Sequence, residues 1–222
     1  MCGRFVLKDT IKDLSTFFQV DNIHDLFLLP KYNIYPGQNV PVIIMEEGKK
    51  FIMMRWGLVP SWSNDPMIGF QMINARAETL SQKPSFKSSF KKHRCIIPCS
   101  GFYEWEKLDK KTKVPYFIRL KNRKPFALAG LWDRWKKDGG NLTTFTIITT
   151  AANKIIEPIH DRMPVILKSK IHDLWLNPDI TDTDTINDFL KPYPSDEMEL
   201  YKISTIVNNP KNDSPQCIEP IE

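Results

Sequence analysis

The chain has no long apolar stretch. No run approaches the ~18–20 consecutive apolar residues that a helix needs to span a bilayer. The first ten residues, MCGRFVLKDT, carry charges where a secretory signal develops its apolar core. We therefore expect a protein that makes no membrane contact and stays in the cytoplasm.

Cysteine is scarce as well. The 222 residues hold four cysteines (Cys2, Cys95, Cys99 and Cys217), too few for a disulfide scaffold, and a reducing compartment keeps them as thiols. His93, Cys95 and Cys99 have a loose zinc-ligand spacing, but no fourth ligand is evident. Cys95 begins an apolar run, which favours a buried thiol. The sequence predicts no metal site.

Internal repeats, low-complexity tracts and long linkers are also absent from the sequence. Hydrophobic residues make up 41% of the chain and charged residues 26%, which excludes a disordered chain, a collagen-like fibre and a coiled coil. A chain of this length can bury one sizeable core. We expect a single domain over residues 1–222, with an acidic C-terminal segment that begins near residue 177.

The charges are distributed unevenly. The net charge is +5, but residues 177–222 hold ten acidic and three basic residues, a net of −7, which leaves +12 on residues 1–176. A basic body with an acidic tail suggests a polyanionic partner, and nucleic acid is the common one. Solvated surface lysines produce the same totals, so charge alone leaves both interpretations open.

One basic cluster has helical spacing. Phe86 and Phe90 lie four positions apart, so a helix over Ser85–Lys92 buries both on one face. Such a helix exposes its lysines, which belong to a basic cluster formed by Lys83, Lys87, Lys91, Lys92 and Arg94. This pattern indicates an amphipathic surface helix first and a nucleic-acid patch second.

Strand and helix patterns follow one another without regular alternation. Strands are predicted at Val40–Met45, Phe51–Trp56, Arg94–Pro98, Pro115–Leu120, Phe126–Trp132, Thr143–Thr150, Pro164–Leu167 and Leu200–Val207. Helices are predicted at Asp9–Gln19, with Asp9 as the cap, and at Ala77–Gln82, Ser85–Lys92, Ala152–Ile156 and Lys170–Leu176. This order disfavours a doubly wound parallel sheet. We expect an α+β fold with a mostly antiparallel, partly barrelled β-sheet core and short flanking helices.

Cys2 is the first candidate for chemistry. If Met1 is removed, Cys2 carries an α-amine and a thiol on adjacent carbons, with ordinary pKa values of about 7.7–8.0 and 8.5. An aldehyde can condense with the amine, and the thiol can then close a thiazolidine ring. Gly3 permits close backbone approach, and Arg4 supplies a neighbouring cation. The alternative is a frayed terminus with an incidental cysteine.

Three further segments carry polar side chains suited to catalysis or anion binding. Asn74 and Arg76 are expected at the entrance to a short helix, where they present an amide and a guanidinium or, alternatively, a helix cap and a surface arginine. Glu104 lies in an aromatic-rich strand, where burial raises its pKa, or it pairs with an arginine such as Arg76. His160 titrates near neutral pH, and Arg162 can bind a phosphate.

Together these segments resemble the motifs of the SOS-response-associated peptidase (SRAP) family, the abasic-site processing proteins. The matching segments are Met1–Phe5, Trp56–Trp62, Asn74–Thr79, Arg94–Pro98, Gly101–Trp105, Ala127–Trp132 and His160–Pro164. They occur in the family's order and extend from residue 1 to about residue 208. The acidic tail is the part that least resembles the family.

The resemblance implies a protein that removes its own initiator Met, binds single-stranded DNA and crosslinks covalently to abasic sites through their ring-opened aldehyde. It implies that Cys2 is the nucleophile, that Asn74 orients the amine or sugar and that Glu104 acts as acid and base. His160 is implied to stabilise the intermediate and assist crosslink reversal, and Thr149 to add a polar contact.

The same resemblance implies DNA contacts outside the reacting atoms. Arg4, Arg76 and Arg162 are expected to hold phosphates, and Trp62 and Trp105 to stack on bases. Such contacts give sequence-independent, salt-sensitive affinity. A monomer, a bacterial or phage origin, no cofactor and a weak lyase activity at abasic sites are further expectations.

Two other functions fit parts of the pattern. One is a cysteine hydrolase that acts on other peptides or amides, with Cys2 as nucleophile, His160 as base and Glu104 or Asn74 as the orienting group. The other is a basic single-strand-binding module in which Cys2 is irrelevant. A retained DNA adduct distinguishes the crosslinking hypothesis from both alternatives.

Overall fold

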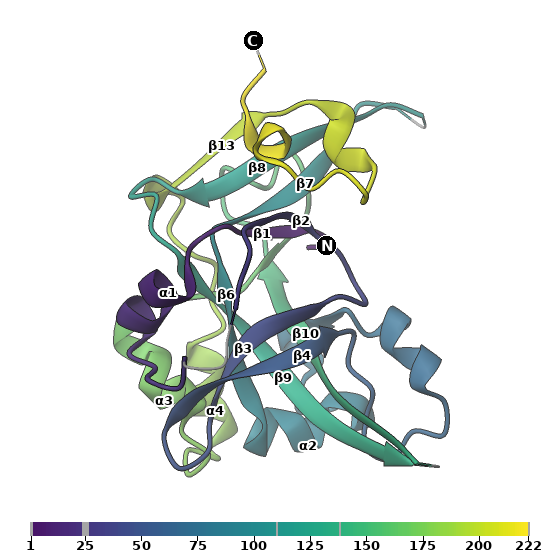
Figure 1. Ribbon diagram of the computed structural model, residues 1–222, viewed down its shortest axis with the longest axis vertical. Coiled ribbons are helices and arrows are strands. Elements are labelled where there is room, and N and C mark those ends of the chain that lie inside the picture. Colours follow the sequence, from purple (N-terminus) through teal and green to yellow (C-terminus); the bar gives the residue numbers. More distant parts are fainter. Residues whose placement is uncertain (1, 24–26, 110, 138, 222) are drawn as a thin grey trace.

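The computed structural model describes residues 2–23, 27–109, 111–137 and 139–221. Two β-sheets follow one another along the longest axis of the molecule, and short helices lie at their margins (Figure 1). The smaller sheet has the strand order β13–β8–β7–β1–β2, with all neighbours antiparallel. Its strands are β1 (Phe5–Leu7), β2 (Lys31–Ile34), β7 (Gly101–Lys107), β8 (Lys113–Leu120) and β13 (Met198–Lys202).

The larger sheet closes on itself. Its order is β11–β10–β4–β3–β6–β9–β12, and β10 also pairs with β9, so β10, β4, β3, β6 and β9 form a closed ring. The strands are β3 (Asn39–Met45), β4 (Lys49–Trp56), β5 (Asn74–Arg76), β6 (Arg94–Cys99), β9 (Phe126–Lys137), β10 (Gly140–Ala151), β11 (Arg162–Pro164) and β12 (Ile166–Leu167). The pairs β10–β4 and β10–β5 are parallel. The expected α+β fold with a mostly antiparallel, partly barrelled sheet is therefore confirmed.

The helices are short. The α-helices are α1 (Ile11–Phe18), α2 (Pro84–Lys92), α3 (His172–Leu176) and α4 (Thr183–Asp188). The 3-10 helices are η1 (Pro66–Gln71), η2 (Ala77–Thr79), η3 (Ser169–Ile171), η4 (Ser195–Glu197), η5 (Thr205–Asn208) and η6 (Pro215–Ile218). Within the described part of the chain, no helix has the length and apolarity to cross a membrane.

The first helix begins one residue later than predicted. Thr10 rather than Asp9 caps it, because the Thr10 hydroxyl accepts a hydrogen bond from the Asp13 N–H at 3.2 Å and donates to the Asp13 carboxylate at 2.7 Å. The Asp9 carboxylate instead accepts a hydrogen bond from the Ser100 hydroxyl. The predicted helix over Ser85–Lys92 is confirmed as α2.

Three other element predictions are wrong in part or entirely. Ala152–Ile156 forms turns rather than a helix: the Asn153 side chain caps a first turn, but Pro158 supplies no N–H to extend it. The strand expected at Leu200–Val207 ends at Lys202, because the Ser204 side chain caps η5. The helix expected at Ala77–Gln82 is shorter in the structure and consists of the 3-10 turn η2.

The N-terminal segment lies where the two sheets meet (Figure 1). Ser100 alone separates β6 of the ring from β7 of the smaller sheet, and its N–H donates to the Val6 carbonyl of β1 at 2.7 Å. The Phe5 ring packs edge-on against Trp56 of β4, with centroids 5.2 Å apart. These contacts fix β1, and with it the residues that precede it, against both sheets.

Candidate active site

Cys2 is held by Asn74. The Asn74 side-chain amide donates a hydrogen bond to the Cys2 carbonyl at 2.8 Å, and Cys2 itself is fully buried. Asn74 lies in β5 rather than at a helix entrance, so the helix-cap interpretation is wrong. Its other side-chain atom, Oδ1, is buried and accepts no hydrogen bond from the described residues. Cys2 is therefore an anchored residue rather than a frayed terminus.

Glu104 reaches the same place from β7. Phe5 pairs with Phe102, and the Tyr103 N–H donates to the Arg4 carbonyl at 3.0 Å. Continued along the antiparallel pair, this register brings Glu104 opposite the residues just after Cys2. Glu104 is only 3% exposed. Cys2, Asn74 and Glu104 thus come together from three separate segments.

Burial sets the protonation of Glu104. Loss of hydration raises its pKa to about 7, and the nearby Asp161 charge acts in the same direction, while a hydrogen bond from the Trp105 N–H opposes both. A carboxyl that titrates near neutral pH can both donate and accept a proton there. The sequence-based expectation of a raised pKa agrees with this placement. The suggested partner Arg76 has an exposed side chain and is not a core arginine.

The Cys2 thiol differs from the expectation. Burial raises its pKa well above the ordinary value, and the Glu104 charge raises it further. The thiol is therefore protonated at neutral pH, and it is less readily ionised than a free cysteine with its ordinary pKa of about 8.5. A reaction through sulfur needs a base to take its proton. Glu104 is close enough to shift this pKa electrostatically.

His160 lies in the turn between β10 and β11, and its side chain is 26% exposed. Its Nδ1 lies 2.9 Å from the Asp161 carboxylate and 3.0 Å from the Arg162 backbone nitrogen. Burial lowers the pKa of His160, so the ring is neutral at neutral pH. In a neutral ring Nδ1 either donates to the carboxylate or accepts from the N–H, depending on the tautomer. Asp161 acts electrostatically on both His160 and Glu104, which places the three groups in one neighbourhood.

Thr149 belongs to β10 beside these segments. It pairs with Arg76 of β5 on one side and with Pro164 of β11 on the other. Thr149 is fully buried, and its hydroxyl makes no hydrogen bond within the described chain. Buried hydroxyls usually have partners, so this one is available to a bound molecule.

The three arginines have different environments. Arg4 donates to the Asn33 side chain at 2.8 Å and to the Val207 carbonyl at 3.0 Å. Arg162 forms a two-bond ion pair with Glu78, at 2.7 and 2.9 Å, and donates to the Thr149 carbonyl at 2.7 Å. Arg76 is exposed and forms no ion pair with any described residue. As placed, Arg76 is the arginine most open to a phosphate.

Of the two tryptophans, Trp62 is exposed and Trp105 is partly buried. Trp62 is 61% exposed in the loop after β4, and its neighbour Ser61 donates its N–H to the Asp133 carboxylate at 2.8 Å. Trp105 donates its indole N–H to the Asn208 side chain at 2.7 Å. A groove of about 470 Å³ passes this ring, lined by Arg4, Trp105, Lys111, Lys113 and Asn208.

Sequence reasoning assigned no role to Asp161, Glu78 or Asn208. Asp161 and Glu78 lie inside the motifs His160–Pro164 and Asn74–Thr79. Their position next to candidate site residues could have indicated that they contact the site. Asn208 had no such signal, because it reaches Trp105 from more than a hundred residues away.

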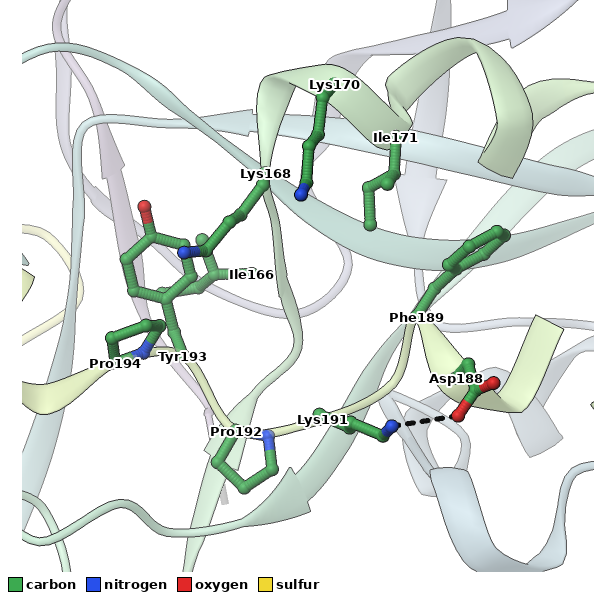
Figure 2. A pocket seen from close by; sticks show the side chains of 10 residues that line it. All are labelled: Ile166, Lys168, Lys170, Ile171, Asp188, Phe189, Lys191, Pro192, Tyr193 and Pro194. Carbon is green, nitrogen blue, oxygen red and sulfur yellow. Dashed lines mark ion pairs between the residues drawn. The ribbon is translucent and has the colours of Figure 1, made fainter. Parts of the chain in front are cut away.

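A second pocket, of about 200 Å³, lies apart from these residues (Figure 2). It is formed by residues 166–171 and 188–194 and contains none of the predicted site residues. Two of its lysines are neutralised: Lys168 pairs with Glu197 at 3.2 Å and Lys191 with Asp188 at 2.8 Å. It is not part of the candidate site.

The zinc-like spacing does not form a metal centre. Cys95 and Cys99 are fully buried thiols, and the His93 ring stacks on Trp132 with centroids 4.5 Å apart. Among the residues whose placement is described, no group of three or more His, Cys, Asp or Glu side chains could hold a metal ion.

Known proteins resemble this chain over most of its length. The family model for "SOS response associated peptidase (SRAP)" matches residues 1–210. The abasic site processing protein YoqW of Bacillus subtilis is 49% identical over 222 residues, which cover 99% of each chain. The abasic site processing protein HMCES of Xenopus tropicalis is 32% identical, over 86% of this chain and 66% of its own length.

Solved structures share the fold. A protein from Bacteroides thetaiotaomicron superposes with a TM-score of 0.90 and 29% identity, and the match covers 100% of both chains. A phage-related protein from Bordetella bronchiseptica gives a TM-score of 0.71 and 27% identity, over 91% of this chain and 94% of its own.

Proposed function

The chain belongs to the SOS response associated peptidase family, and we propose that it processes abasic sites in DNA by forming a covalent crosslink through Cys2. The observation that carries this proposal is the buried arrangement in which Asn74 holds Cys2 at 2.8 Å beside a carboxyl that titrates near neutral pH. The names of relatives such as YoqW support the choice of substrate.

The first step frees the reactive amine. Hydrolysis of the Met1–Cys2 peptide bond consumes one water, releases methionine and leaves an α-amine on Cys2. We assign this cleavage to the protein itself. The hydrogen bond from Asn74 to the Cys2 carbonyl then fixes the direction in which the new amine points.

The amine reacts before the thiol. The neutral amine adds to the aldehyde of the ring-opened sugar, and protonated Glu104 donates a proton to the resulting hydroxyl, which leaves as water. This step produces a protonated Schiff base, with the positive charge on its nitrogen, and a Glu104 carboxylate. The order follows from the raised pKa of the Cys2 thiol, which is protonated when the aldehyde arrives.

The thiol then closes the ring. The Glu104 carboxylate takes the proton from the Cys2 sulfur, the sulfur bonds to the Schiff-base carbon, and the nitrogen receives the electron pair of the C=N bond. The products are a thiazolidine and protonated Glu104, so one carboxyl serves as acid and then as base. Overall the amine, thiol and aldehyde combine with loss of one water.

The neighbouring groups stabilise intermediates and hold DNA. His160 stabilises the Schiff base and assists its reversal, and the Thr149 hydroxyl and Asn74 Oδ1 supply hydrogen bonds to the opened sugar. Arg76 binds phosphate, with Arg4 and Arg162 nearby, and Trp62 and Trp105 stack on bases of the single strand. The same Schiff base permits slow strand cleavage by β-elimination. The protein acts as a cytoplasmic monomer.

The direct test is a denaturing gel with single-stranded DNA that carries one abasic site. Wild type should give a heat-stable adduct, and Cys2→Ala none. Cys2→Ser is the matched control, because it keeps the size and polarity of the side chain and replaces only sulfur with oxygen. It should give an adduct only when borohydride reduces the Schiff base. A stable Cys2→Ala adduct would refute the proposal, and release of a cleaved peptide without any adduct would favour the hydrolase.

A further inference from the structure

The loop after β4 is attached at several points to β9 and β10. We refer to residues 57–65 as the Trp62 loop. Backbone N–H groups at alternate positions of this loop donate hydrogen bonds of 2.8 Å, from Gly57 to the Phe145 carbonyl, from Val59 to the Thr144 hydroxyl and from Ser61 to the Asp133 carboxylate. The Trp135 indole N–H then donates to the Ser63 carbonyl, also at 2.8 Å. These four bonds fix the path of the loop along the two strands.

Asp133 and Trp135 hold the loop on either side of Trp62. They lie two residues apart in β9, so their side chains share one face of the strand, and both are buried. The groups that they bind belong to Ser61 and Ser63, which are also two residues apart. Trp62 lies between these two fixed points, and its side chain is 61% exposed. Two buried side chains therefore fix the backbone on both sides of an exposed indole.

In the part of the chain that the structure describes, the Asp133 carboxylate is buried without a lysine or arginine partner. His93 Nδ1 lies 3.9 Å away, and burial lowers the pKa of that ring, while Arg134 pairs with Glu46 instead. The backbone N–H groups of Ser61 and Arg134, each at 2.8 Å, stabilise the carboxylate. An apolar side chain at this position would avoid the cost of dehydrating a charge. What the carboxylate adds is the hydrogen bond to the loop.

We propose that Asp133 and Trp135 are positioning residues for DNA binding, because they fix the loop that presents Trp62 to a base of the single strand. The inference rests on the proposed function, which assigns base stacking to Trp62. A loop that is already ordered loses little conformational freedom when a base stacks on its indole, so binding is tighter than with a mobile loop. Asp133 and Trp135 themselves make no contact with DNA in this scheme.

The test measures affinity for a single strand of about eight nucleotides. The strand carries a reduced, non-aldehyde abasic site, so it cannot crosslink. Asp133→Ala should weaken binding by about five- to tenfold, as expected for one lost hydrogen bond, although the substitution removes a negative charge that repels DNA. Asp133→Asn loses the same charge but keeps an acceptor oxygen for the Ser61 N–H, and it should restore the affinity of wild type.

A double-mutant cycle shows whether Asp133 acts through Trp62. Where Trp62 is already replaced with alanine, Asp133→Ala should cause no further loss of affinity. Trp135→Phe keeps an aromatic ring but removes the N–H that binds the Ser63 carbonyl, and its effect should depend on Trp62 in the same way. This second variant tests the proposal even if Asp133→Ala does not fold.

Asp182→Ala is the matched control. The Asp182 carboxylate also accepts a backbone N–H, that of Thr185 at 2.9 Å, but it caps α4 rather than holding the Trp62 loop, so this variant should keep the affinity of wild type. The inference would be overturned by equal affinities of Asp133→Ala and wild type, by the same loss with and without Trp62, or by an Asp133→Asn variant as weak as Asp133→Ala. Crosslinking of the unreduced strand by wild type reports separately on the proposed function.

Discussion

Replacement of Glu104 with Gln should stabilise the protein at pH 8 and change its stability little at pH 5. The folded-state pKa is about 7, against an ordinary value of 4.5. Between these values the unfolded chain releases the proton and the folded protein retains it, so stability falls as pH rises through this window. Glutamine has nearly the shape of the protonated acid and never acquires the charge.

The magnitude follows from the size of the shift. The raised pKa corresponds to a loss of about 3 kcal/mol of folding stability, most of which occurs between pH 5 and pH 8. Urea unfolding of wild type and Glu104→Gln at pH 5 and 8 measures it as the difference between the two pH dependences. Glu157→Gln, which removes an exposed carboxylate, is the matched control. Parallel pH dependences for wild type and Glu104→Gln would refute the argument that burial sets this pKa.

Four other predictions concern the reaction and DNA binding. The crosslinking rate should have a bell-shaped pH dependence, because the amine is protonated at low pH and Glu104 ionises near pH 7. Glu104→Gln should lose the fall in rate on the alkaline side. An unchanged pH profile in this variant would exclude Glu104 as the acid. Asn74→Ala should slow crosslinking by about tenfold or more, as expected for a lost buried hydrogen bond of ~1–3 kcal/mol, and an unchanged single-turnover rate would contradict that role. Glu78→Gln should free Arg162 and tighten binding to single-stranded DNA, and the slope of log affinity against log salt should steepen by about 0.7. The loss of folding stability should stay below about 1 kcal/mol because Glu78 is half exposed. Weaker binding would refute this prediction. Trp62→Ala should weaken single-strand binding by about 1–3 kcal/mol while the melting temperature stays within a few degrees, and equal affinities would exclude stacking.

Local patterns were sufficient for the class of fold and for its surface helix. Short apolar runs next to turn residues, such as Val40–Met45, predicted strands that the structure contains as β3 and its neighbours. Phe86 and Phe90, four residues apart, predicted α2. Both predictions depend on residues that are close together in the sequence. Over such short distances the backbone geometry of a helix or strand directly determines which side chains share a face.

Interactions between distant segments were beyond local patterns. The bond from Asn74 to Cys2 depends on the pairing of β5 with β10, and Arg4 binds both Asn33 of β2 and Val207 of the C-terminal η5. The protonated state of the Cys2 thiol depends on burial beneath two sheets, which a sequence position alone does not fix. The motif at Arg162 likewise gave no indication that Glu78 would occupy its guanidinium.

The most direct test of the central claim is the intact mass of the product formed with single-stranded DNA carrying one abasic site. The account predicts a single covalent species whose mass equals the protein without Met1 plus the DNA, less one water. It should persist after borohydride treatment without gaining hydrogen, because a thiazolidine has no C=N bond to reduce. A species that retains Met1, or one that gains two hydrogens on reduction, would contradict ring closure through Cys2.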